Sequence, residues 1–194
     1  MIPRNRGCEF CRISQLPYRA KHCKECNRCV RKYDHHCHWI GCCVGELNHR
    51  SFFGFLMFQM ITCLNNIDHC IGANFDRKND FPNDHKMQSH VQSIWALFGF
   101  IAFMFLLMTA GLGFYHAYLI TTAQTTWEHT RRHTITYLRP YSNKIMPFYV
   151  SVRVNLQRTF FHGGKCFDWR LRQPSQLKEI QGFNICNNEY FDCC

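Results

Sequence analysis

Short cysteine spacings dominate the first fifty residues and limit what this part of the chain can fold into. Cys-x2-Cys pairs occur at Cys8 and Cys11 and again in the run from Cys23 to Cys29. Thiolates and imidazoles at such spacings suit tetrahedral zinc, which takes four ligands in a structural site. Two closed sites are therefore expected, with the ligands Cys8, Cys11, His22, Cys23, Cys26, Cys29, His36 and Cys43.

This ligand set leaves Cys37 free, inside the tetrapeptide Asp34-His35-His36-Cys37. An imidazole can take a thiol proton near neutral pH, and a carboxylate on its other nitrogen fixes its tautomer. The tetrapeptide therefore predicts a nucleophilic cysteine next to a zinc site. The alternative is that Cys37 or Cys42 is itself a zinc ligand and the segment is an inert zinc knuckle.

A longer pattern surrounds the tetrapeptide, running from Pro17 through the zinc donors to Asn48 and Phe52. This stretch resembles the cysteine-rich domain of DHHC protein S-acyltransferases, the zinc-finger DHHC palmitoyltransferases. Further along, Thr125-Thr126-Trp127-Glu128 resembles the TTxE motif of that family, and Asn155 resembles its C-terminal asparagine.

The resemblance implies a membrane enzyme that takes a fatty acyl group from palmitoyl-CoA onto Cys37 and passes it to a cysteine of a membrane-associated protein. It gives His35 the role of general base, Asp34 that of its orienting partner and His36 that of a zinc ligand. The implied cofactors are two structural zinc ions, and palmitoyl-CoA is the acyl donor.

The resemblance also implies supporting residues outside the tetrapeptide. Thr126 would hydrogen-bond Asp34, and Asn155 would support the C-terminal region. Arg19 and Lys21 precede the zinc ligands, where the phosphates of CoA could be bound. A merely solvated charge is the alternative for these two residues.

Two uncharged segments could enter a membrane. No Lys, Arg, Asp or Glu occurs from Met87 to Trp127, which easily exceeds the ~20 residues that a spanning helix needs. Residues 51–67 are also uncharged but form a marginal span, for which a buried soluble helix is the alternative. The expected fold is a membrane protein with a small zinc-stapled domain of short β-hairpins and loops, two transmembrane α-helices and a short mixed cytosolic tail.

The expected domain plan follows these segments. Residues 1–50 form the zinc domain, 51–67 the first span, 68–90 a lumenal loop, 91–124 the second span, and 125–194 the region with the TTxE motif and the C-terminal tail. Basic residues flank both spans on their outer ends, which predicts that both termini and the active site face the cytosol. Golgi or endoplasmic reticulum membranes are implied by the resemblance alone.

A net charge of +10 fits the anionic cytosolic leaflet and the phosphates of CoA. It also leaves open a zinc-binding interaction module that contacts nucleic acid. No zinc finger with a recognition helix occurs, so no nucleic acid partner is expected. Most family members have two further helices before the cysteine-rich domain, whereas Cys8 here follows Met1 closely. A catalytically impaired membrane scaffold is therefore a further alternative.

Overall fold

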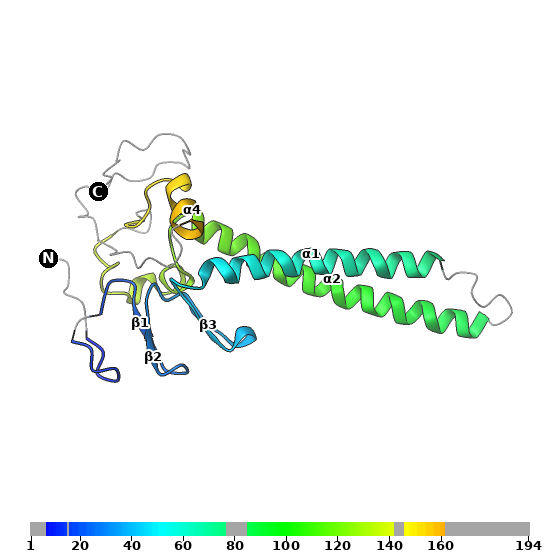
Figure 1. The fold of residues 1–194 in the computed structure, drawn as a ribbon, viewed down its shortest axis with the longest axis horizontal. Helices are drawn as coiled ribbons and strands as arrows, with labels where there is room; N and C mark the ends of the chain where they lie inside the picture. The colour runs from blue at the N-terminus through cyan, green and yellow to red at the C-terminus, as the bar shows by residue number, and fades with distance from the viewer. Residues whose placement is uncertain (1–6, 15, 77–84, 142–145, 162–194) are drawn as a thin grey trace. The chain divides into compact units, whose positions relative to one another are not determined.

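The computed structural model describes residues 7–14, 16–76, 85–141 and 146–161 (Figure 1). Contacts along the chain divide it into two compact units. Unit 1 combines residues 1–52 with residues 116–194, and unit 2 comprises residues 53–115.

Two small antiparallel hairpins form the amino-terminal part of unit 1 (Figure 1). The first pairs β1 (Lys21–Cys23) with β2 (Arg28–Val30), and the second pairs β3 (His35–Cys37) with β4 (Cys42–Val44). The second hairpin turns through a short 3₁₀ helix, η1 (His38–Ile40). Gly41 follows η1 with a φ of 63°, a left-handed conformation that glycine adopts at no steric cost.

These hairpins contain little apolar material of their own. Their buried cluster consists of Cys23, Tyr33 and Cys43, with Val30 and Trp127 packed against it. A core of this size rarely stabilises a small domain without metals or disulfides. The expected zinc staples therefore match a physical need of this part of the fold.

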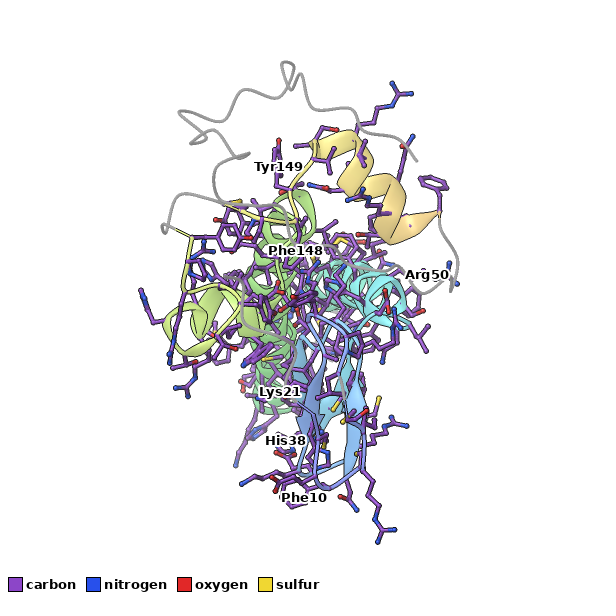
Figure 2. The ribbon with its side chains drawn as sticks, turned by 90° about the vertical axis from the view of Figure 1, so that its left-hand side faces the viewer. Phe10, Lys21, His38, Arg50, Phe148 and Tyr149 are labelled. Carbon is purple, nitrogen blue, oxygen red and sulfur yellow. The ribbon has the colours of Figure 1, made fainter. Side chains whose placement is uncertain are left out.

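The carboxyl-terminal part of unit 1 contains α3 (Thr126–Thr130), a 3₁₀ helix η3 (Arg132–Thr134) and α4 (Val152–Phe160). Its buried apolar cluster contains Ala123, Ile135, Tyr137, Leu138 and Phe148. Figure 2 shows Phe148 in the crowded centre of the view, whereas His38 of η1 and Phe10 lie towards its lower end. This cluster forms the base on which α3 is held.

Unit 2 consists of most of α1 (His49–Asp76) and α2 (His85–Thr121). The two helices approach closely at glycines, since a Cβ added to Gly113 would lie 2.7 Å from Met57 and one added to Gly99 would lie 3.4 Å from Cys70. Among the described residues, α2 is the one helix that is both long and apolar enough to cross a membrane.

The helices differ from the expected boundaries. The segment predicted as a loop, residues 68–90, is helical up to Asp76 and again from His85, because a charged residue ends an apolar span without ending a helix. The gap between the helices, residues 77–84, lies outside the described residues, as do residues 162–194 of the predicted tail. At its other end α2 stops at Thr121, before the predicted residue 124.

Candidate active site and zinc centres

The eight predicted zinc donors gather in two clusters of four. Cys8, Cys11, His22 and Cys29 form the first cluster. His22 lies on β1 directly opposite Cys29 on β2, and its Nδ1 atom is 3.3 Å from the Cys11 Sγ atom. Bonds of 2.0 to 2.3 Å around tetrahedral zinc give ligand separations of roughly 3.5 Å. The donor set and its spacing therefore fit a closed zinc site.

Cys23, Cys26, His36 and Cys43 form the second cluster. The Nδ1 atom of His36 is 3.3 Å from the Cys26 Sγ atom and 3.7 Å from the Cys43 Sγ atom. Its other ring nitrogen, Nε2, lies 2.9 Å from the Glu25 carboxylate. A carboxylate behind a ligating imidazole fixes the ring and the tautomer that presents a lone pair to the metal. This cluster also fits zinc, and Glu25 is a contact that sequence reasoning missed.

The pleat of β3 separates the metal-donor residue His36 from the proposed base and nucleophile, His35 and Cys37. Successive side chains of a strand point to opposite faces, so His36 lies on one face and His35 and Cys37 share the other. Cys43, directly opposite His36, joins the zinc cluster, whereas Cys37 belongs to neither zinc cluster. Neither Cys37 nor Cys42 takes part in them, so this geometry disfavours the alternative in which one of these cysteines is a ligand.

Asp34 and His35 form a hydrogen-bonded pair next to Cys37. The Nδ1 atom of His35 is 2.7 Å from the Asp34 Oδ2 atom, and the amide of Thr126 donates to the Asp34 Oδ1 atom over 2.8 Å. The Asp34 side chain is 1% exposed. The sequence predicted that Thr126 would hydrogen-bond Asp34. In the structure the backbone amide of Thr126 makes this bond.

These contacts fix the charge state of the pair. Burial alone would raise the pKa of Asp34, but hydrogen bonds from His35 and Thr126 hold it well below its usual range. Burial alone would lower the pKa of His35, but its contacts with Asp34 and Cys37 raise it. The lowered pKa keeps Asp34 a carboxylate, and a carboxylate at this distance favours the protonated form of His35.

Two further histidines lie behind this pair, and sequence reasoning missed both. The Nε2 atom of His49 is 3.2 Å from the Nδ1 atom of His116, and both side chains are buried. The ring of His116 lies 5.8 Å from that of His35, and the ring of Phe52 lies 5.3 Å from that of His35. These rings restrict the movement of the His35 imidazole. No spacing rule could find them, since His49 and His116 are 67 positions apart.

The TTxE segment is held by a buried ion pair with Arg19. Thr125 caps α3 in a reciprocal capping box with Glu128. Both oxygens of Glu128 accept from Arg19, at 2.8 Å and 2.6 Å, and Tyr137 donates to one of them over 2.9 Å. The Arg19 guanidinium also lies 4.2 Å from the centre of the Phe148 ring.

This placement bears directly on the role expected for Arg19. The residue is 1% exposed and its guanidinium is bound within the protein, so the geometry does not support a contact with CoA phosphates. Arg19 instead joins the zinc-bearing part of unit 1 to the segment that carries Thr126. The capping-box spacing of Thr125 and Glu128 was the one sequence signal for this arrangement.

Asn155 has a comparable role at α4. It is buried, and its side-chain amide donates to the carbonyl of Thr121 over 2.8 Å. Thr121 is the last residue of α2, where backbone carbonyls lack partners within the helix. Asn155 therefore secures α4 to this helix end.

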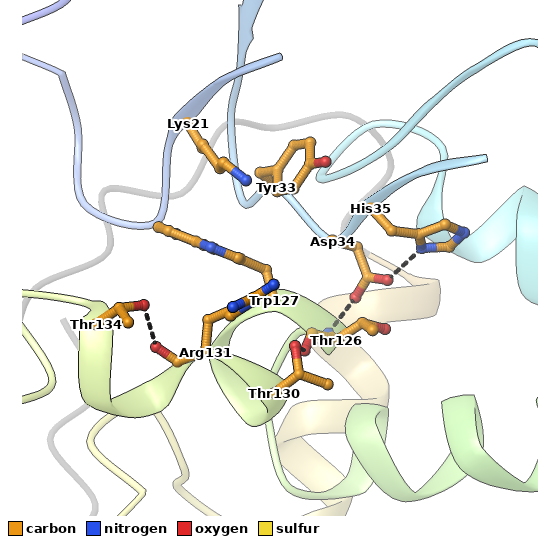
Figure 3. Close-up of a pocket in the computed structure, with 9 residues that line it drawn as sticks. All are labelled: Lys21, Tyr33, Asp34, His35, Thr126, Trp127, Thr130, Arg131 and Thr134. Carbon is orange, nitrogen blue, oxygen red and sulfur yellow. Dashed lines mark hydrogen bonds and ion pairs between the residues drawn. The ribbon is translucent and has the colours of Figure 1, made fainter. Parts of the chain in front are cut away.

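Lys21 lies at the edge of a pocket of about 430 Å³ that reaches Asp34 and His35. Figure 3 shows these two residues on one side of the pocket, with Lys21 and Arg131 across it. The Lys21 ammonium lies 4.7 Å from the Tyr33 ring and 5.3 Å from the Trp127 ring. The pocket thus contains the positive charges of Lys21 and Arg131, and the rings of Tyr33 and Trp127 lie against the Lys21 ammonium.

Comparison with known proteins agrees with this geometry. The family model described as DHHC palmitoyltransferase matches residues 2–133. The chain belongs to the DHHC palmitoyltransferase family. It is 36% identical over 196 residues to a putative ZDHHC-type palmitoyltransferase 7 of Dictyostelium discoideum, covering 96% of this chain and 43% of that protein.

Other relatives resemble this DHHC chain over shorter stretches. Protein S-acyltransferase 10 of Arabidopsis thaliana is 32% identical over 153 residues, covering 79% of this chain and 42% of that protein. Palmitoyltransferase ZDHHC17 of Danio rerio is 57% identical over 53 residues, which cover 27% of this chain and 8% of that protein. The chain therefore spans less than half the length of these relatives.

Proposed function

We propose that this chain is a protein S-acyltransferase that carries a fatty acyl group from acyl-CoA on Cys37 and transfers it to a cysteine of a membrane-proximal protein. The observation that carries this proposal is the Asp34–His35 hydrogen bond of 2.7 Å on the Cys37 face of β3. Family membership and the names of the relatives support the reaction class.

The proposed reaction has two steps. His35 takes the proton of Cys37, and Asp34 stabilises the resulting imidazolium. The Cys37 sulfur attacks the thioester carbonyl carbon of acyl-CoA, and CoA leaves as a thiolate that receives the proton from His35. In the second step the sulfur of a substrate cysteine attacks the carbonyl carbon of the Cys37 thioester, the bond to Cys37 breaks, and the substrate proton passes through His35 to the Cys37 thiolate. Ping-pong kinetics are therefore expected.

The two zinc clusters have a structural role in this proposal. Held by these two donor clusters, zinc would close the loops around β3 and would supply folding free energy. His36 and Cys43 hold opposite strands of the second hairpin from the zinc face, and this fixes the direction in which His35 and Cys37 point.

We assign the CoA phosphates to the pocket next to Asp34 and His35. Lys21 and Arg131 supply positive charge there, and the hydroxyl groups of Thr130 and Thr134 line the same pocket. Charged donors of this kind bind phosphate oxygens strongly. This assignment keeps the predicted contact for Lys21 and replaces Arg19 by Arg131.

The membrane setting is part of the proposal. The length and apolar character of α2 support a spanning helix, with α1 as its partner. The basic residues at the outer ends of both helices favour a cytosolic active site, in Golgi or endoplasmic reticulum membranes. Acyl-CoA and membrane-associated proteins with accessible cysteines are the proposed partners, and no nucleic acid is expected.

Single-turnover labelling tests the function. The chain in membranes is incubated with labelled palmitoyl-CoA, and hydroxylamine-sensitive label and zinc content are measured for wild type, Cys37→Ser and His35→Ala. We expect label on the wild type, none on Cys37→Ser, and loading slowed by roughly 10²-fold or more in His35→Ala. All three proteins should retain both zinc ions.

The outcomes separate the alternatives. Absence of label on a zinc-loaded wild type would contradict the proposal and favour an impaired scaffold. Loss of zinc from Cys37→Ser would show that the assignment of ligands is wrong. Unchanged loading in His35→Ala would remove His35 as the base.

A further inference from the structure

Cys42 lies directly across the second hairpin from Cys37 in the antiparallel register of β3 and β4. Residues that face each other in such a pair project from the same side of the sheet, with Cβ atoms about 4.5–5.5 Å apart. The zinc ligands His36 and Cys43 occupy the opposite face. The proposed acyl carrier and a second thiol are therefore nearest cross-strand neighbours.

The two thiols differ in surroundings. Cys37 is 6% exposed, whereas Cys42 is half-buried. Within the described part of the chain, Cys42 belongs to neither zinc cluster. Its Sγ atom has a long contact of 3.9 Å with the side-chain amide of Asn48, which is itself held by the Cys43 carbonyl over 2.9 Å. Cys42 is thus a thiol in a defined position that takes no part in the proposed mechanism.

We propose that Cys42 is a second acyl-carrying site, which receives the fatty acyl group from Cys37 by thioester exchange. The inference rests on the proposed function, because Cys37 must first be acylated. The Cys42 sulfur attacks the carbonyl carbon of the Cys37 thioester, a new carbon–sulfur bond forms, and the bond to Cys37 breaks. The proton of Cys42 passes through His35 to the departing Cys37 thiolate.

The exchange needs no oxidant or further cofactor, because one thioester replaces another. It is intramolecular, and well-placed reacting groups gain greatly over the same groups in solution. The register limits the exchange to Cys42, since the other described cysteines of unit 1 are in zinc clusters. The half-buried position of Cys42 leaves an acyl group there more open to an incoming cysteine than one on Cys37.

A pulse and chase with labelled palmitoyl-CoA tests the exchange under reducing conditions that prevent disulfides. After a short pulse the donor is removed, and samples are digested at intervals with a protease that cleaves after Trp39. This cut separates Cys37 from Cys42. Label on each peptide is quantified for wild type, Cys42→Ser, Cys37→Ser and, as a matched control, Cys63→Ser.

In wild type and Cys63→Ser we expect label on the Cys37 peptide to fall as label on the Cys42 peptide rises. Cys42→Ser should hold label on Cys37 alone throughout the chase, since the thiol that would accept it is lost. Cys37→Ser should show no label on either peptide. Zinc content is measured for each protein, so that a folding defect is recognised.

Label that stays on Cys37 in wild type, with none on Cys42, would overturn the inference and leave the proposed function intact. Label on Cys42 in Cys37→Ser would also overturn it, because Cys42 would then load directly from the donor. A zinc-loaded wild type without any label would instead contradict the proposed function itself.

Discussion

Unit 1 is held by polar contacts between residues far apart in the sequence, whereas unit 2 consists of two helices that contact each other at small residues. In unit 1, Thr126 reaches Asp34 across 92 positions and Arg19 reaches Glu128 across 109. In unit 2 the close approaches occur at the small residues Gly99 and Gly113. Many of its large apolar side chains are exposed, among them Leu107 and Phe114.

This difference between the two units predicts where the chain is sensitive to substitution. A metal ligand or a buried ion pair depends on one particular partner atom, so its loss cannot be absorbed by repacking. Exposed apolar side chains on a helix have no such partner within their unit. We therefore expect a steep gradient of sensitivity from the zinc clusters to the outer surface of α2.

The largest effect should come from a zinc ligand. Cys26→Ser removes one donor from the second cluster, and since zinc binding is coupled to folding we expect a loss of several kcal/mol in stability. Zinc content should fall from two ions to one per chain, and acyl loading should be abolished. Atomic absorption and thermal unfolding measure these changes. Retention of two zinc ions by Cys26→Ser would contradict the assignment of Cys26 as a ligand and the greater sensitivity expected of unit 1.

An intermediate effect should come from the ion pair that holds α3. Glu128→Gln leaves the Arg19 charge buried without its counter-ion, which typically costs about 3–5 kcal/mol. Because α3 also presents the Thr126 amide to Asp34, acyl loading should slow while zinc content stays at two. Thermal unfolding and single-turnover loading are the measurements.

The control for this prediction is Glu9→Gln, which neutralises an exposed carboxylate in the same unit. Its effect on stability should stay within about 0.5 kcal/mol. Equal melting temperatures for the two variants would contradict the structural role given to Arg19 and Glu128.

The smallest effect should come from the outer surface of unit 2. Leu107 is 54% exposed in the middle of α2, so Leu107→Ala should change stability by no more than about 0.5 kcal/mol. On the same helix, Leu119 is fully buried within unit 1, and Leu119→Ala should cost about 2–5 kcal/mol. Thermal unfolding of Leu107→Ala and Leu119→Ala in the same detergent measures the difference between the two positions. A larger effect at Leu107 would show that a partner covers this surface.

The sequence was most informative where function demands particular residue types at short spacing. The zinc donors and the tetrapeptide Asp34-His35-His36-Cys37 could be recognised because metal coordination and acid–base chemistry allow few substitutes, whereas the TTxE segment was recognised by its family resemblance alone. The apolar run of α2 was equally legible, since a spanning helix needs a long uncharged segment. The lengths of the helices could not be predicted, because residues 68–76 continue α1 although they include charged side chains.

The long-range contacts could not be read in advance. Arg19 has a side chain that commonly binds phosphate. In the structure it is a buried structural cation, because folding places Glu128, Tyr137 and Phe148 around it. His49 and His116 carry no motif, yet the His116 ring lies 5.8 Å from that of His35, and His49 contacts His116.

Residue types alone predict which chemistry is available to this protein, namely two sets of soft metal donors, a thiol beside an imidazole and a carboxylate, and an apolar helix. Strand pairing and packing then assign the donors to their clusters, place Cys37 on the face of β3 opposite His36, and bring Cys42 across from it. The physical reason is that residue type fixes what a group can bind, whereas strand register and side-chain packing fix which groups meet.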